Sequence, residues 1–167
     1  MKLCAALLVF CAAVCAGFAI RERLQQRVDI CTALNLFLCE LRFFGRLHKP
    51  LPDVLTALSL RPELSALPFL ADCVRRLQKG DSLPSAWADA VERYCRRERV
   101  FRQARTFADL IPALCAADAE RYDALLSLYE ARAQQMLESA QKTAASAARQ
   151  CVYISGAIGL ACGILIL

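Results

Sequence analysis

The chain has 167 residues, which leaves room for one domain of ordinary size, and its formal net charge is +5 at pH 7. Its apolar share of 57% exceeds the roughly 45–50% of a typical soluble globular chain. The excess is concentrated at the two ends: residues 3–20 and 151–167 carry no charge, while all 16 acidic residues and every Lys and Arg except Lys2 lie between them. This distribution argues against an ordinary soluble domain and divides the chain into a charged middle and two apolar ends.

The first apolar end predicts an amino-terminal transmembrane helix over residues 1–20. Its uncharged run, "LCAALLVFCAAVCAGFAI", would reach about 26 Å as a helix, close to the hydrocarbon thickness of a bilayer. The alternative is a cleaved secretory signal, with Lys2 as its basic region and residues 14–16 as the cleavage site. The charged residues 21–23 follow the run at once, as in a stop-transfer flank, and favour a retained span.

The charged middle, residues 21–150, is predicted to be a helical bundle. Residues 21–48 repeat apolar side chains at helical spacing, and we expect the first span to continue into this helix until Pro50 and Pro52 end it. A short helix is expected over residues 51–60. Another should follow between Pro62 and Gly80, bent or restarted at Pro68.

Two further segments complete the middle. Asp81 or Ser82 offers an N-cap for a helix over residues 83–95, and a basic segment, "RRERVFRQARTFADLI", continues to Pro112. From Asp118, one apolar face recurs every three or four residues and thins to alanine: Tyr122, Leu125, Leu126, Tyr129, Ala133, Met136, Leu137, Ala140, Ala144 and Ala147. Such a narrow stripe permits the close approach of another helix or belongs to a mostly solvated stalk.

The last helix is expected to continue into a second transmembrane helix over residues 151–167, "CVYISGAIGLACGILIL". A buried core helix is the alternative, which three glycines and the lack of polar residues make less suitable. No stretch alternates with period two for long enough to indicate a strand, so the fold class is all-α: a membrane-anchored helical bundle with two terminal spans.

Basic residues near the ends of the spans predict the orientation. Arg21, Arg23 and Arg27 follow the first span, and Lys142 and Arg149 precede the second, whereas only Lys2 lies on the other side. Because basic flanks are retained in the cytoplasm, we expect a two-pass protein of the cell membrane with its helical domain cytoplasmic.

Small residues at spacings of four predict a face on each span that permits close helix packing, either with the other span or with another protein. The alternative is glycine present by composition alone. The residues are Ala13, Gly17, Ser155, Gly159 and Gly163.

The inventory of reactive residues gives no catalytic site. His48 is the single histidine and is expected in a surface loop, so neither a histidine-based triad nor a His-rich metal site can be assembled. The glycines form no phosphate-binding loop, and the ten cysteines contain no Cys-x-x-Cys pair, which suggests small core residues in a reducing compartment. We therefore predict a non-enzyme with no cofactor, no metal, no small-molecule substrate and no nucleic-acid partner.

The most distinctive charged feature is a run of arginines relieved only by Glu92 and Glu98. It is either a solvated helix face with local ion pairs or a contact surface for anionic lipid or an acidic partner. Its members are Arg93, Arg96, Arg97, Arg99, Arg102 and Arg105. Trp87, in "SAWADAV", is expected to anchor the core rather than to stack on a ligand.

Several segments resemble the stage III sporulation protein AB family over nearly the whole chain. "MKLCAALLV" with "AGFAIRERL" is similar to its first span, "TALNLFLCEL" to its first cytoplasmic helix, and "LQKGDSLPSAWADAVERY" to the stretch that carries its tryptophan. "FADLIPALCAADAERYDALLSLYEARAQQML" and "SGAIGLACGILIL" resemble its last helix and final span. The sequence departs from the family in a longer loop over residues 40–50 and in Leu114-Cys115, where the family has Leu-Gly.

The resemblance implies a non-enzymatic platform component of the sporulation channel complex between mother cell and forespore. Its cytoplasmic domain would be similar to the F domain of type II secretion and type IV pilus platform proteins, and would meet an ATPase-like subunit. The expected location is the mother-cell or outer forespore membrane. A membrane-tethered adaptor or regulator unrelated to transport is the alternative function, and a membrane enzyme is disfavoured by the residue inventory.

Overall fold

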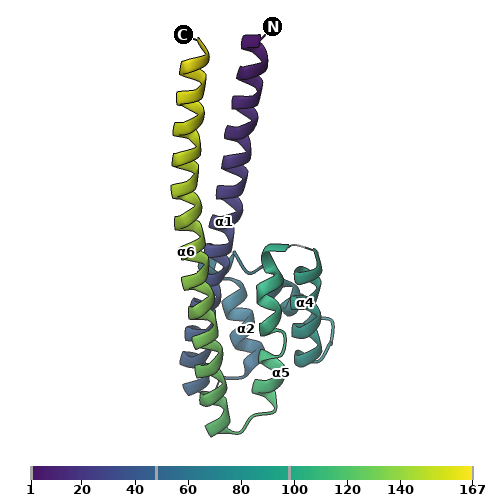
Figure 1. Cartoon of the computed structure of the whole chain (residues 1–167). Coiled ribbons are helices and arrows are strands. Elements are labelled where there is room, and N and C mark those ends of the chain that lie inside the picture. Colours follow the sequence, from purple (N-terminus) through teal and green to yellow (C-terminus); the bar gives the residue numbers. More distant parts are fainter. Residues whose placement is uncertain (1, 48, 98, 167) are drawn as a thin grey trace. The chain divides into compact units, whose positions relative to one another are not determined.

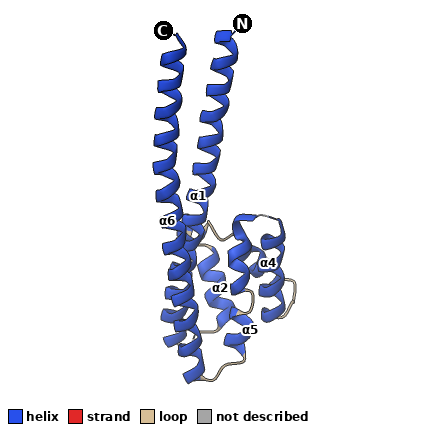
Figure 2. Ribbon diagram, viewed as in Figure 1, coloured by secondary structure: helices blue, strands red, loops and turns tan. Residues whose placement is uncertain are grey.

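A computed structural model describes the backbone of residues 2–47, 49–97 and 99–166, and the side chains of residues 15, 17–47, 49–97, 102, 104–118 and 120–147. All regular structure in these ranges is helical, which confirms the all-α prediction (Figure 2). The α-helices are α1 Lys2–Arg46, α2 Leu51–Ser59, α3 Pro68–Leu77, α4 Leu83–Arg97, α5 Leu110–Cys115 and α6 Ala119–Ile166, and two 3-10 helices are η1 Pro62–Leu64 and η2 Arg99–Phe107 (Figure 1).

The chain divides into two compact units. Unit 1 combines Met1–Val28 with Glu138–Leu167, and unit 2 is Asp29–Leu137. Both long helices, α1 and α6, pass through the two division points without a break. These divisions differ from the predicted membrane boundaries at residues 20 and 150, which stay predictions.

Unit 1 contains the two apolar ends. Within the part of the chain that the structure describes, no helix is both long and apolar enough to cross a membrane. The side chains of residues 1–14, 16 and 148–167, which make up most of both predicted spans, lie outside that part. Ala13, Ser155, Gly159 and Gly163 are among them, so the predicted packing of the spans stays a prediction. At Gly17, a Cβ would meet no described atom within 4 Å.

Unit 2 has its own hydrophobic core. Two long helices contribute the faces that their helical spacing predicts to be buried. From α1 these are Leu34, Leu38 and Leu41, and from α6 they are Leu126 and Ala133. The shorter helices close the core from the other side with the buried side chains Val54, Leu58, Phe69, Leu70, Cys73, Trp87, Val91, Phe107, Leu110 and Leu114.

Within unit 2, α1 and α6 are joined directly. Arg42 donates to the Ser127 hydroxyl at 2.7 Å and forms a 2.8 Å ion pair with Glu130. One turn further along α1, the Tyr122 ring of α6 lies against Gly45, because a Cβ added at this glycine would be 2.7 Å from the ring. Glycine at this position therefore makes room for the tyrosine.

Prolines and one glycine set the element boundaries of unit 2. Pro50 precedes α2, Pro62 opens η1, and Pro68 opens α3, as expected because proline is tolerated in the first turn of a helix. Gly80 has a φ of 95°, a conformation that glycine adopts without steric cost, and it forms the turn that leads to α4.

The helix expected to run from residue 21 until Pro50 is confirmed as far as Arg46, so most of the stretch over residues 40–50, where a longer loop was noted, is helical. One sequence expectation is wrong: Pro112 does not end the preceding segment but lies inside α5. As the third residue of that helix, it needs no amide hydrogen, since the first amides of a helix have no intrahelical acceptor. The predicted surface position of His48 lies outside the described residues.

Candidate functional site

The candidate site is built on α4 and η2, the two elements that carry the arginine run. α4 is amphipathic: Ala86, Trp87, Ala90 and Val91 are buried, and the arginines at its end lie on the outer side. η2 is fixed in the same way by the buried side chains of Ala104 and Phe107. Their spacing of three residues fits the three-residue turn of a 3-10 helix.

Trp87 joins these two elements to the rest of the core. Its side chain is 0% exposed, and its indole nitrogen donates to the carbonyl of Phe107, the last residue of η2, at 2.8 Å. The indole stacks on Phe37 of α1, with ring centroids 5.6 Å apart, and meets the edge of Phe69 of α3 at the same distance. The position of η2 relative to α4 thus depends on one large buried side chain.

The arginine run does not form one continuous helix. α4 ends at Arg97, and the chain continues as the 3-10 helix η2 from Arg99. The run is therefore not a single α-helical face, because the helix type changes after Arg97. The side chain of Arg99 lies outside the described residues. The remaining five arginines, Arg93, Arg96, Arg97, Arg102 and Arg105, are called the arginine surface below.

Three of the five are paired with acidic side chains. Arg93 lies 3.3 Å from Asp72, a carboxylate only 5% exposed, which also accepts from Arg75 at 2.6 Å. Arg96 and Arg105 both reach Glu92, at 2.7 Å and 3.7 Å. The hydrogen bond from Arg96 lowers the pKa of the Glu92 carboxyl below its usual value.

The other two carry unbalanced charge. Arg97 and Arg102 are exposed, and neither has an ion pair with another described residue. Since Glu92 is shared between two arginines, the described part of the surface has more positive than negative groups. Such a surface attracts anionic groups in a salt-dependent manner.

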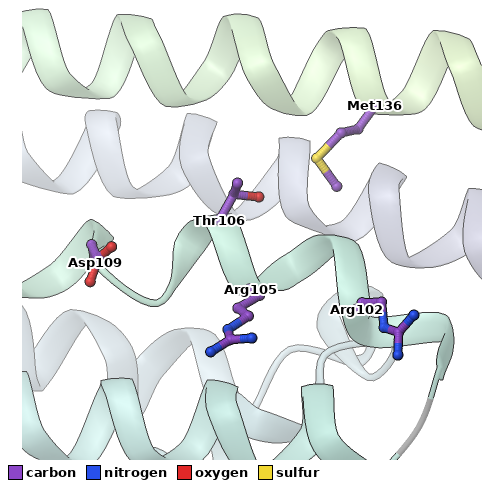
Figure 3. A pocket seen from close by; sticks show the side chains of 5 residues that line it. All are labelled: Arg102, Arg105, Thr106, Asp109 and Met136. Carbon is purple, nitrogen blue, oxygen red and sulfur yellow. The ribbon is translucent and has the colours of Figure 1, made fainter.

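Two grooves adjoin the arginine surface. One, of about 490 Å³, is lined by charged residues of α3 and α4: Arg76, Asp89, Glu92, Arg93, Arg96 and Arg97. Arg76 there pairs with Asp89 at 2.7 Å. The other, of about 530 Å³, lies beside η2 and is lined by Arg102, Arg105, Thr106, Asp109 and Met136 (Figure 3).

Sequence reasoning missed the buried carboxylate and both grooves. Asp72 is the one polar residue among the buried residues of α3, which also include Leu70 and Cys73. An acidic residue inside such a stripe was the available signal, because buried carboxylates require charged or hydrogen-bonding partners. The grooves bring together residues far apart in sequence, and no local pattern marks them.

Among the residues searched, no cluster of three His, Cys, Asp or Glu side chains could hold a metal ion.

Taken together, unit 2 is a small all-α unit with a positively charged surface on α4 and η2, and it includes part of each long helix, α1 and α6. Residues 2–167 match the family described as stage III sporulation protein AB. The chain belongs to this family, and membership gives it a role in sporulation. No curated protein and no solved structure matches the chain at a significant level.

Proposed function

We propose that the protein is a non-enzymatic membrane platform of the sporulation channel complex between mother cell and forespore, and that unit 2 docks an ATPase-like cytoplasmic subunit. The proposal combines family membership with the arginine surface of α4 and η2. It includes two terminal spans in the mother-cell or outer forespore membrane, with unit 2 in the cytoplasm, as the basic flanks predict.

The observation that carries the docking proposal is the unbalanced charge of Arg97 and Arg102. Ion pairs between exposed side chains contribute only about 0–1 kcal/mol, so a run of arginines adds little to the stability of the fold. An acidic partner would gain from them by electrostatic attraction and faster association. A surface that is basic, exposed and built on elements fixed by Trp87 suits a protein partner.

The test is reversal of three exposed arginines, Arg96, Arg97 and Arg102, to Glu in the full chain. Binding to the purified ATPase-like subunit should fall markedly, because attraction is replaced by repulsion across the contact. Folding should be retained, since exposed charges change stability by no more than about 0.5 kcal/mol each. Circular dichroism would show an unchanged helical signal.

Two controls complete this test. Arg121→Glu, on the exposed part of α6 in unit 2, changes charge away from the arginine surface and should leave binding unchanged. Binding by the parent chain should also weaken between low and physiological salt. A folded triple variant that binds as well as the parent would rule out docking through this surface.

A further inference from the structure

The groove beside η2 combines features that the arginine surface alone does not have. In Figure 3, Met136 extends from α6 toward η2 and Thr106 points from η2 toward α6, whereas the guanidinium groups of Arg102 and Arg105 point away from α6. We call this feature the Met136 groove, defined by its five lining residues. Its sides come from two elements fixed in the core of unit 2.

The groove has space for a large side chain. It is open to solvent and has a volume of about 530 Å³. Met136 is partly exposed and packs against the core, so its thioether lies at the boundary between core and solvent. Methionine is flexible and polarizable, and it is used at surfaces that adapt to apolar partners.

The charge beside the groove indicates what kind of partner would enter it. Arg102 is exposed and has no ion pair with a described residue, and Arg105 reaches Glu92 only at 3.7 Å. Glu92 is held more closely by Arg96, at 2.7 Å. Asp109 is the single acidic residue of the lining, so the described rim is positive on balance.

Protein interfaces combine these properties: an apolar anchor enters a pocket, and a polar rim surrounds it. We propose that the Met136 groove receives one bulky apolar side chain from an acidic segment of the docking partner, whose carboxylates lie across Arg102 and Arg105. This inference rests on the proposed docking function and adds the chemistry of the partner's contact segment. An anionic lipid headgroup would use the arginines but would leave the groove unused.

The experiment measures binding of the full chain, in a neutral detergent, to the purified ATPase-like subunit of the sporulation complex. Met136→Glu places a carboxylate in the groove, and Thr106→Phe fills it while every arginine is retained. Each variant should weaken binding about tenfold or more, as expected when an anchor loses its pocket. Since Thr106 is exposed, its replacement keeps the test valid even if Met136→Glu disturbs the core.

Two matched controls accompany these variants. Leu128→Glu also places a carboxylate at an exposed apolar position of α6, at 47% exposure, but outside the groove lining, and should leave the affinity within about twofold. Met136→Leu preserves an apolar side chain of similar size and should bind nearly as well as the parent.

A parallel measurement with Arg102→Glu separates this inference from the docking proposal. If Arg102→Glu weakens binding and a folded Thr106→Phe does not, docking stands and the groove is not its anchor. If neither weakens binding, both proposals are wrong. Binding of the parent chain to phosphatidylglycerol micelles that depends on Arg102, together with no binding of the subunit, would assign the arginines to lipid and leave the groove without a role. A fall in the sedimentation mass of the chain alone in Met136→Glu would assign it to a second copy. Either result would overturn the inference.

Discussion

Trp87 is the residue on which the geometry of the arginine surface depends most. It is fully buried, contacts Phe37 and Phe69, and holds the end of η2 through the carbonyl of Phe107. Truncation to alanine should destabilise unit 2 by about 3–5 kcal/mol, because it leaves a large cavity and an unpaired carbonyl. Thermal or denaturant unfolding of the full chain measures this, and an unchanged transition would contradict the role of Trp87 as the core anchor.

The burial of Cys73 can be tested by chemical labelling, without any mutation. Burial raises the pKa of its thiol to about 12, with the neighbouring Asp72 adding to the rise. At pH 8 the thiol is therefore protonated as well as shielded, and the thiolate is the form that reacts with alkylating reagents. Cys73 should remain unlabelled in the native chain and become labelled in denaturant.

The control for this experiment is Cys39, which is exposed on α1 in the same unit. Mass spectrometry of the labelled peptides distinguishes the two thiols. Labelling of native Cys73 as fast as that of Cys39 would mean that the packing of α3 against the core is wrong.

At the scale of elements, the contact between α1 and α6 in unit 2 depends on Arg42. Arg42 forms an ion pair with Glu130 and donates a hydrogen bond to Ser127. The side chains of Arg42 and Glu130 are 27% and 23% exposed. Arg42→Ala should destabilise unit 2 by about 1–3 kcal/mol, since Glu130 would lose its cation in a partly buried setting. Arg121→Ala on the exposed part of α6 is the control and should change stability by less than about 0.5 kcal/mol. Equal effects in the unfolding midpoint would contradict this role.

Local rules predict most of the elements because prolines and apolar periodicity act over a few residues. The start of α3 at Pro68 and the buried faces of α1 and α6 follow in this way. The 3-10 form of η2 does not, because apolar residues such as Ala104 and Phe107 fit a turn of either type. The last residue of η2 is held by the hydrogen bond from Trp87, which lies 20 residues away in the sequence.

The candidate site was only partly predictable for the same reason. Its arginines are visible in the sequence, but their pairing is not. Asp72 meets Arg93 across 21 residues, and Met136 lies beside Thr106 only after α6 has packed in unit 2. Contacts of this kind depend on tertiary structure, which no local pattern encodes.

At the scale of the whole molecule, topology decides whether the proposed docking can occur. A cytoplasmic ATPase-like subunit reaches unit 2 only if the charged middle lies on the cytoplasmic side. The basic residues that flank both apolar ends predict this arrangement, with Lys2 alone on the other side.

The most direct measurement uses a reporter enzyme that is active only outside the cytoplasm. Fused after Leu167 it should be active, and inserted at the exposed Gly80-Asp81 turn it should be inactive, because unit 2 would be cytoplasmic and the carboxyl end would not. Equal amounts of both fusions, checked by immunoblot, make the comparison valid. An active reporter at Gly80-Asp81 with an inactive one after Leu167 would place unit 2 outside the cytoplasm and contradict the platform function.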